Sequence, residues 1–160
     1  MRDTMRRRDR EVTEKSDMIA IIDECDVCRV GMRDEDGMYI VPMNFGYEYK
    51  DDELTLYFHG SKDGRKVDAI EKDPNVCFEM DCAHELVTDE IVCKYGYLYK
   101  SVFGEGKAEI ISDIGEKKKA LGLIMKHLTG KDFEIKDAMA TSIAITRLKV
   151  SSLTGKARTE

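Results

Sequence analysis

The chain has 160 residues, of which 42% are hydrophobic and 36% are charged, and its formal net charge is −6 at pH 7. This length fits a single domain spanning residues 1–160. The acidic balance argues against nonspecific nucleic-acid binding, because the phosphates would be repelled. No apolar run reaches the roughly 18 residues of a membrane span, and the N-terminus lacks the apolar core of a secretory signal. We therefore expect a cytoplasmic protein that binds neither nucleic acid nor membranes.

The first third of the sequence predicts a lead-in, a short helix and two strands. Residues 1–15 are expected to be a flexible or extended lead-in with a short basic run. Ser16 or Asp17 is predicted to cap a helix over residues 18–22. One strand is expected before the turn at residues 34–37, and one long strand over residues 38–47.

The stretch 54–66 is the most informative part of the chain. It predicts a buried strand, a polar turn that contains Gly60 and Gly64, and a helix that begins with Arg65 and Lys66. Such a junction collects backbone N–H groups, a helix N-terminus and positive charge at one point, which suits a phosphate. A solvated helix start is the alternative interpretation of the two cations.

Three ring-bearing side chains, Tyr57, Phe58 and His59, precede that turn. They could face the flat group to which a phosphate is attached, so the two signals together indicate a nucleotide-like cofactor. His59 is a candidate catalytic residue, as a proton donor or substrate contact, because imidazole titrates near neutral pH. The alternative is a histidine with only a structural role.

The remaining sequence predicts further strands and one long helix. A short helix over residues 66–70, a strand over 76–80 and a polar loop over 84–90 come first. Strands over 97–103 and 107–111 are joined through Gly104-Glu105-Gly106, which predicts a bent or bulged strand. Asp113 is expected to cap a helix over residues 115–127, and residues 142–150 alternate as a strand. Six or seven strands with inserted helices favour a mainly β fold, closed as a small barrel.

Five cysteines raise the question of a metal site. Cys25 and Cys28 have the two-residue spacing of zinc and redox sites, and a second group comprises Cys77, Cys82, His84 and Cys93. The irregular spacing of the second group, and the apolar neighbours of Cys28 and Cys77, favour structural cysteines over zinc. We predict no metal, and the role of Cys25 and Cys28 stays open.

Seven motifs follow one another in a specific order: residues 28–31 (CRVG), 40–46 (IVPMNFG), 56–59 (LYFH), 64–66 (GRK), 73–79 (DPNVCFE), 99–106 (YKSVFGEG) and 153–156 (LTGK). In this order the motifs resemble those of the pyridoxamine 5′-phosphate oxidase-related flavoproteins. Within that family they are most similar to the 5-nitroimidazole-resistance, or nitroimidazole reductase-like, branch. The resemblance covers the chain from about residue 7 onward.

The resemblance implies a split β-barrel of the FMN-binding, Greek-key type that forms a homodimer, with the flavin between the protomers. It places Arg65 and Lys66 at the FMN phosphate. The other cofactor-binding residues that it implies are Pro42, Met43, Asn44 and Phe45 through their backbone, Tyr57, Phe58 and His59 on the adjoining strand, and Lys100, Ser101 and Val102 on a later strand. The chain shows no counterpart of the C-terminal substrate segment found in the oxidases that make pyridoxal phosphate, which argues against that reaction.

The leading hypothesis is an FMN-dependent oxidoreductase that passes electrons from NAD(P)H to a small acceptor such as a nitroaromatic or a quinone. A noncatalytic flavin-binding or redox-sensing protein is one alternative. A split-barrel binder of haem or deazaflavin is another. The sequence shows no nicotinamide-binding glycine fingerprint, although a reductant can approach a flavin without one.

Overall fold

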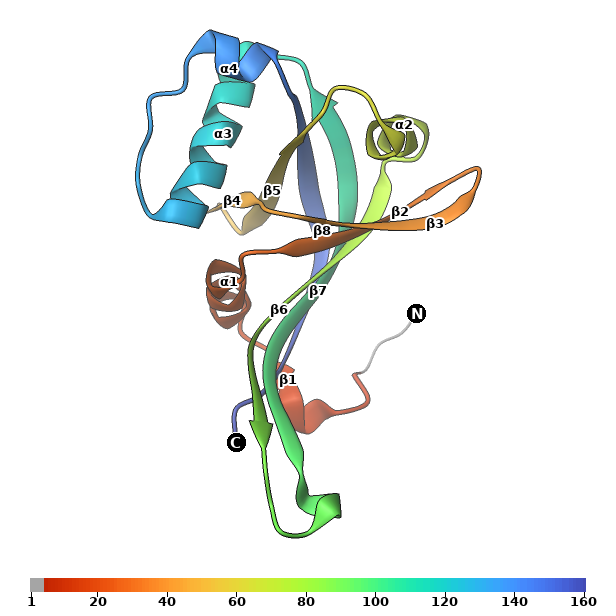
Figure 1. The fold of residues 1–160 in the computed structure, drawn as a ribbon, viewed down its shortest axis with the longest axis vertical. Coiled ribbons are helices and arrows are strands. Elements are labelled where there is room, and N and C mark those ends of the chain that lie inside the picture. The colour runs from red at the N-terminus through yellow and green to blue at the C-terminus, as the bar shows by residue number, and fades with distance from the viewer. Residues whose placement is uncertain (1–4) are drawn as a thin grey trace.

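The computed structural model describes residues 5–160, and one antiparallel sheet dominates it (Figure 1). Its strands are ordered β3-β2-β6-β7-β8-β5-β4, and β1 pairs with β8 beside this path. The bounds are β1 Glu11–Val12, β2 Cys28–Asp34, β3 Gly37–Met43, β4 Gly46–Lys50, β5 Glu53–Gly60, β6 Asn75–Val87, β7 Gly96–Ile111 and β8 Ala144–Arg158. The predicted mainly β fold with inserted helices is confirmed, with eight described strands in place of six or seven.

Short helices flank this sheet. They are η1 Arg8–Arg10, α1 Lys15–Glu24, α2 Arg65–Lys72, η2 Val92–Lys94, α3 Ile114–Thr129 and α4 Asp137–Thr141. Figure 1 shows α2 and α3 on opposite sides of the upper sheet and α1 beside its middle, whereas β6 and β7 continue downward as a long hairpin. Over residues 5–160, no helix has both the length and the apolar character that a membrane crossing requires.

The start of α1 differs from the prediction. Glu14 occupies the N-cap position without a capping side chain, so the predicted caps, Ser16 and Asp17, lie inside the helix. The amides of Asp17 and Met18 donate to the Glu14 carbonyl at 3.1 and 3.2 Å. Asp17 in the first turn still complements the positive end of the helix dipole.

The lead-in expected over residues 1–15 lies partly outside the described residues. Within it, Glu11 and Val12 pair with Lys156 and Gly155 of β8. The described part of this segment therefore extends the sheet at the strand that carries the C-terminus.

The prediction of one long strand over residues 38–47 is wrong. The chain forms two strands here, β3 and β4, which lie at opposite ends of the sheet order. Gly46 begins β4 where a Cβ would clash with the backbone of Ile124, so only glycine lets α3 approach this closely. Pro42 lies on the terminal strand β3, where it pairs with Arg29 of β2, and an edge strand tolerates a residue without a backbone N–H.

The polar loop predicted over residues 84–90 is also wrong for its first half. β6 continues to Val87, and Glu85 pairs with Leu98 of β7 after an irregularity that follows Cys82. Most side chains of this hairpin are exposed on both faces. Without a buried face the sequence carries no apolar alternation, and the strand is hard to recognise.

The bulge predicted on the strand that carries Gly104 and Gly106 lies opposite these glycines, on β8. The register between β7 and β8 shifts at this point, and the extra residue is Ser151 of β8. A Cβ on Gly104 would clash with the Phe78 ring, and one on Gly106 would clash with the Lys149 carbonyl. Glycine is therefore required by close packing, and β7 runs through without a break.

Two hydrophobic clusters fill the interior. The larger one joins the sheet to α1 and α2, and its fully buried members include Ile22, Phe45, Phe58, Phe78 and Met80. The smaller one lies under α3 and comprises Tyr57, Ile111, Ala120, Ile124 and Ile145.

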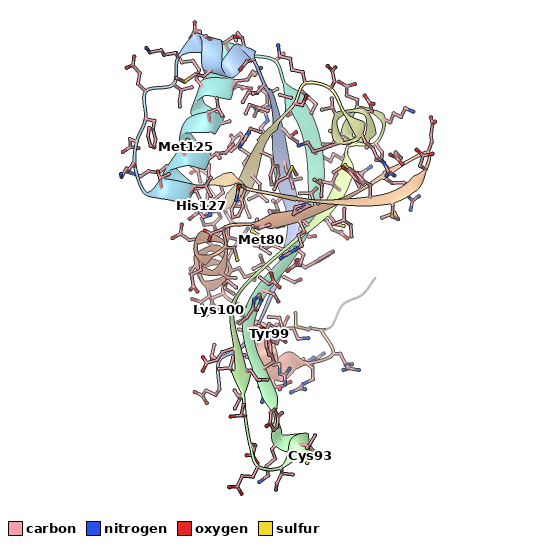
Figure 2. All side chains as sticks on the ribbon, in the orientation of Figure 1. Met80, Cys93, Tyr99, Lys100, Met125 and His127 are labelled. Carbon is pink, nitrogen blue, oxygen red and sulfur yellow. The ribbon has the colours of Figure 1, made fainter. Side chains whose placement is uncertain are left out.

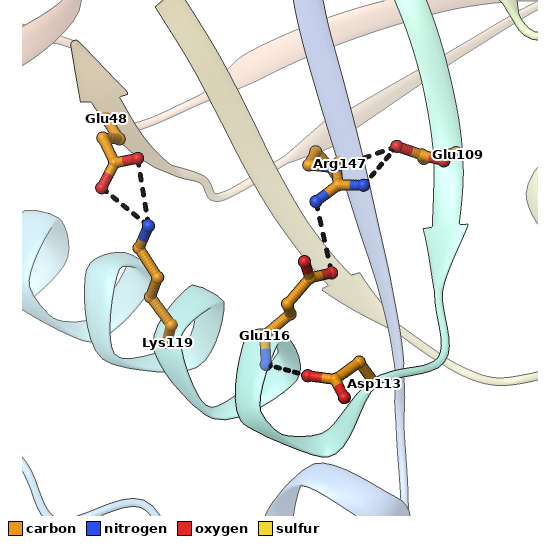
Figure 3. A network of polar contacts seen from close by, with 6 residues as sticks. All are labelled: Glu48, Glu109, Asp113, Glu116, Lys119 and Arg147. Carbon is orange, nitrogen blue, oxygen red and sulfur yellow. Dashed lines mark hydrogen bonds and ion pairs between the residues drawn. The ribbon is translucent and has the colours of Figure 1, made fainter. Parts of the chain in front are cut away.

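Polar contacts anchor α3 to the sheet (Figure 3). The predicted cap is confirmed, since the Asp113 carboxylate accepts from the Glu116 amide at 2.9 Å. Lys119 pairs with Glu48 of β4 at 2.9 Å. Arg147 of β8 bridges two carboxylates, those of Glu109 on β7 and Glu116 on α3. The helix is thereby fixed over the smaller cluster.

Candidate functional site

The phosphate-binding junction predicted from the sequence forms a tight strand-to-helix connection. β5 ends at Gly60, a short loop follows, and α2 begins at Arg65. Gly64 at the N-cap has φ of 141°, a conformation that side-chain-bearing residues rarely adopt. The glycine therefore permits the sharp entry into α2 that places Arg65 and Lys66 in its first turn.

Lys66 is a half-buried cation without an anionic partner. Its Nζ lies 3.3 Å from the Met43 Sδ, and no described carboxylate comes within 4.0 Å of it. Burial lowers the pKa of Lys66. A Cβ on Gly60 would lie 2.6 Å from the same Nζ, so the glycine leaves the space that the ammonium occupies.

Arg65, its neighbour, is already neutralised. Its Nε and Nη2 donate to the Asp34 carboxylate at 2.5 and 3.0 Å, and its guanidinium lies 4.4 Å from the Tyr39 ring centre. The same hydrogen bonds raise the pKa of Arg65 and lower that of Asp34. The β2–β3 turn thus fixes Arg65, and the sequence analysis missed Asp34 because the pairing bridges segments distant in the chain.

The segment from Pro42 to Phe45 contributes one side chain to the surroundings of Lys66, that of Met43. Pro42 is exposed on the edge strand. The Asn44 amide group donates to the Asp26 carbonyl at 2.9 Å. Phe45 is fully buried and its ring centre lies 4.5 Å from that of His127.

The three ring-bearing residues of β5 point in different directions. Phe58 is buried in the larger cluster and Tyr57 in the smaller one. Burial raises the pKa of Tyr57. His59 is exposed, and strand alternation directs it to the face opposite Gly60 and therefore away from the Lys66 ammonium.

The predicted residues of β7 lie in a different part of the chain from Lys66. Figure 2 places Lys100 beside α1, where its Nζ donates to the Glu24 carboxylate at 2.8 and 2.9 Å. The Ser101 hydroxyl donates to the Lys156 carbonyl at 3.4 Å, and Val102 is buried in the core. Lys100 also lines a hollow of about 390 Å³ between α1 and β1.

One chain therefore presents the predicted cofactor residues as two separate groups. The first group surrounds the start of α2 and contains Lys66, Arg65 and Met43. The second group lies on β7 beside α1 and contains Lys100, Ser101 and Val102.

A groove of about 710 Å³ lies elsewhere, on the outer face of β2, β6, β7 and β8. We call it the outer groove. Its lining residues are Gly31, Met32, Arg33, Met38, Asp73, Asn75, Val76, Cys77, Glu105, Gly106, Lys107, Lys149, Val150 and Ser151. None of them is among the cofactor-binding residues predicted from the sequence.

The cysteines and His84 do not gather around one point. Cys25 and Cys28 are buried in the core, and burial raises the pKa of both thiols. Cys93 lies at the tip of the β6–β7 hairpin (Figure 2), far along the strands from Cys77. Over residues 5–160, no group of three or more potential metal ligands occurs.

One histidine has a buried side chain. The side chain of His127, near the C-terminal end of α3 (Figure 2), is 4% exposed, and its Nε2 lies 2.6 Å from the Cys25 carbonyl. It links α3 to the end of α1. An isolated histidine on a helix gave no signal for this contact, because the partner is a backbone group far away in the sequence.

Residues 14–157 match the model of a family described as pyridoxamine 5′-phosphate oxidase. The chain belongs to this family. Its structure superposes with a TM-score of 0.80 on that of a putative 5-nitroimidazole antibiotic resistance protein from Bacteroides thetaiotaomicron, which is 36% identical; the match covers 92% of this chain and 86% of that one. The resemblance identified from the motifs is confirmed, and so is the split β-barrel fold.

Two more distant structures share the fold. The flavocytochrome Anf3 from Azotobacter vinelandii is 22% identical with a TM-score of 0.79, covering 98% of this chain and 73% of that one. An FAD and haem binding protein from Mycobacterium smegmatis is 14% identical with a TM-score of 0.78, covering 94% and 74%. No curated protein matches the chain.

Proposed function

We propose that this protein is an FMN-dependent oxidoreductase that transfers electrons from NAD(P)H to a small acceptor such as a nitroaromatic or a quinone. The observation that carries the proposal is the half-buried Lys66 ammonium, which among the described residues has only a thioether within hydrogen-bonding distance. Taking a cation out of water costs free energy that an anionic partner offsets. A phosphate bound here supplies that partner beside the N-terminal amides of α2.

Membership of the pyridoxamine 5′-phosphate oxidase family supports a flavin as the group that carries the phosphate. The relatives named as a flavocytochrome and as an FAD and haem binding protein support a planar redox cofactor on this fold. A bound FMN supplies two-electron chemistry, accepting a hydride and passing the electrons on. In this chain Lys66 would hold the phosphate, and the buried Met43 side chain beside it would help to keep water from that end.

A homodimer with the flavin between the protomers is part of the proposal. It is supported by the separation of the two groups of predicted residues within one chain. A second copy can bring its Lys100–Val102 group to the flavin whose phosphate the first copy holds. His59 faces away from Lys66, so we assign it no role at the phosphate and retain it as a candidate proton donor on the other face of β5. The five unpaired thiols support a reducing, cytoplasmic location.

Comparing FMN with riboflavin tests the phosphate site, because riboflavin lacks the phosphate. The wild type should bind FMN more tightly than riboflavin in a fluorescence titration. Lys66→Met should weaken FMN binding about 30-fold or more, the usual effect of removing one partner of a desolvated charge pair. It should leave riboflavin binding unchanged, because riboflavin has no phosphate for the ammonium to neutralise.

Lys72→Met is the matched control, since Lys72 lies on the same helix but is exposed and paired with Glu35. It should bind FMN as the wild type does. A wild type that binds neither flavin, or a Lys66→Met protein that retains the preference for FMN, contradicts the assignment. A Soret band in the absorption spectrum of the protein purified from cells would show that the bound cofactor is haem and not flavin.

Turnover is tested separately from binding. Anaerobic NADH or NADPH should bleach the flavin absorption, and a nitroaromatic or a quinone should restore it. A bound flavin that neither nucleotide nor any other donor reduces would favour a flavin-binding or redox-sensing protein over an enzyme.

A further inference from the structure

The thiols of Cys25 and Cys82 come together between α1 and β6. Cys25 is the C-cap of α1, and Cys82 lies in β6, where it pairs with Lys100 of β7. Both contribute to the larger hydrophobic cluster, Cys25 as a buried member and Cys82 as a half-buried side chain packed against it. The Cys82 Sγ lies 3.8 Å from the carboxylate of Glu24, the residue that precedes Cys25. The two thiols are within hydrogen-bonding reach of each other.

The two sulfur atoms differ in how firmly they are held. The Cys25 amide donates to the Ile22 carbonyl at 3.1 Å, and the Cys25 carbonyl lies 2.6 Å from Nε2 of His127. The β6–β7 register becomes irregular directly after Cys82, and Ala83 has φ of 55°. Such an irregularity re-aims the neighbouring side chain. The pair therefore combines a fixed, buried sulfur with an adjustable sulfur that solvent can reach.

The pair lies on the face of β6 opposite the outer groove. Alternate residues of a strand share a face, so Cys82 points to the same side as Phe78 and Met80 in the larger cluster. Cys77, which lines the outer groove, points to the other side. Cys28 also lies near Cys25 in the sequence, but its side chain is fully buried. An oxidant arriving from solvent therefore meets the Cys25 pair through Cys82.

An ion pair controls the charge beside Cys82. Burial raises the pKa of this thiol, the Cys25 thiol lowers it, and two charges oppose each other, Glu24 raising the pKa and Lys100 lowering it. Burial also raises the pKa of Cys25, as do Cys82 and the carboxylates of Asp81 and Glu24. The thiolate is the nucleophile in thiol oxidation. Cys82 is thus the thiol that reacts first, and the pairing of Lys100 with Glu24 at 2.8 Å moderates its reactivity.

We propose that a peroxide converts Cys25 and Cys82 into a reversible disulfide, which fastens the end of α1 to β6. The Cys82 thiolate attacks one peroxide oxygen, the O–O bond breaks, and the leaving hydroxide takes up the thiol proton as water. The Cys25 sulfur then attacks the sulfenic acid on Cys82, so that the S–S bond forms, the S–O bond breaks and a second water leaves. The two thiols lose two electrons, and one hydrogen peroxide is reduced to two waters.

This inference goes beyond the proposed flavin function, because it rests on the thiol pair and needs no bound cofactor. In a reducing compartment such a bridge is transient and serves redox sensing. Exchange with a small dithiol breaks it again.

Thiol counting on the full chain tests the site. One equivalent of hydrogen peroxide should remove two of the five thiols that a thiol-specific reagent detects in the denatured chain, and dithiothreitol should restore them. Tandem mass spectrometry should place the bridge between Cys25 and Cys82 of the same chain. Closing this long loop should also raise the midpoint of thermal unfolding by about 5–10 °C.

Cysteine variants separate this pair from the other thiols. Cys82→Ser and Cys25→Ala should form no bridge, and peroxide should no longer raise their unfolding midpoints. Cys82→Ser keeps the fold testable, because its side chain is only half-buried. Cys77→Ser is the matched control on the opposite face of β6, and Cys93→Ser is the control at the hairpin tip. Both should form the bridge as the wild type does.

The rate of bridge formation tests the part played by the ion pair. Glu24→Gln should accelerate the reaction about threefold, because Lys100 then faces Cys82 without its counter-ion and increases the thiolate fraction. Glu48→Gln removes the carboxylate that pairs with Lys119 and should leave the rate unchanged. An unchanged or slower rate in Glu24→Gln contradicts Cys82 as the attacking thiol.

Three results would overturn the proposal: a bridge between Cys25 and Cys28, a bridge between two chains, or a wild type in which peroxide forms no disulfide. The flavin titration is independent of these measurements. A protein that forms the bridge but binds no flavin removes only the proposed function, whereas a flavin-binding protein without the bridge removes only the disulfide.

Discussion

Two cations that the family resemblance places at the flavin, Lys66 and Lys100, have opposite surroundings. Lys100 donates to the Glu24 carboxylate, which raises its pKa, and it helps to hold α1 against β7. Lys66 contacts a sulfur atom and is desolvated, which lowers its pKa. An incoming anion gains most from the cation that the protein has left unbalanced. The surroundings of a lysine therefore indicate a ligand site better than its presence in a motif does.

The largest change in the free energy of unfolding should come from a substitution in the core beside Lys100. Val102 is 1% exposed, and Val102→Ala should lower the free energy of unfolding by about 2 kcal/mol through lost burial and a cavity. Urea denaturation measures this change. The exposed control Val92→Ala should change stability by less than about 0.5 kcal/mol. Unchanged stability with a loss of flavin binding would instead make Val102 a direct cofactor contact.

Replacing Lys66 and replacing Lys100 should have opposite effects on the stability of the cofactor-free protein. Lys66→Met removes a desolvated charge and should raise the free energy of unfolding by about 1 kcal/mol or less. Lys100→Met removes a surface ion pair and should lower it by a similarly small amount. A Lys66→Met protein that is less stable than the wild type at neutral pH would show that the ammonium has a stabilising partner.

The gain in the free energy of unfolding that we expect from Lys66→Met should become smaller as the pH rises. The folded-state pKa of Lys66 lies below its usual 10.5, so the unfolded chain binds the proton more tightly than the folded one. The buried ammonium destabilises the folded state fully at pH values below the folded-state pKa, and this destabilisation disappears as the pH rises towards 10.5. The stability difference between wild type and variant should therefore shrink from neutral to alkaline pH, in urea titrations without FMN.

The smallest effect concerns Arg65. Asp34→Asn should free its guanidinium for the phosphate and increase FMN affinity about threefold, in the range of an exposed ion pair. Riboflavin affinity should not change. Glu35→Gln, in the same turn but paired with Lys72, is the control. Weaker FMN binding in Asp34→Asn would mean that Asp34 positions Arg65 for the ligand.

Features governed by neighbouring residues could be predicted from the sequence. The Asp113 cap was confirmed because capping acts over a few residues. The strand over residues 38–47 was wrong because packing against Ile124 forces the break at Gly46. The alternation of apolar and polar residues within residues 38–47 contains no information about α3, which packs against Gly46 from the other half of the chain.

The sequence by itself determined the family, the mainly β fold and the glycine-flanked cationic junction at α2. Only the tertiary structure decided which cations are neutralised. Arg65 meets Asp34 from 31 positions away, and Lys100 meets Glu24 from 76 positions away. Motifs and hydrophobic periodicity arise from residues close in sequence, whereas the balance of charge at a site depends on which distant segments the folded sheet brings into contact.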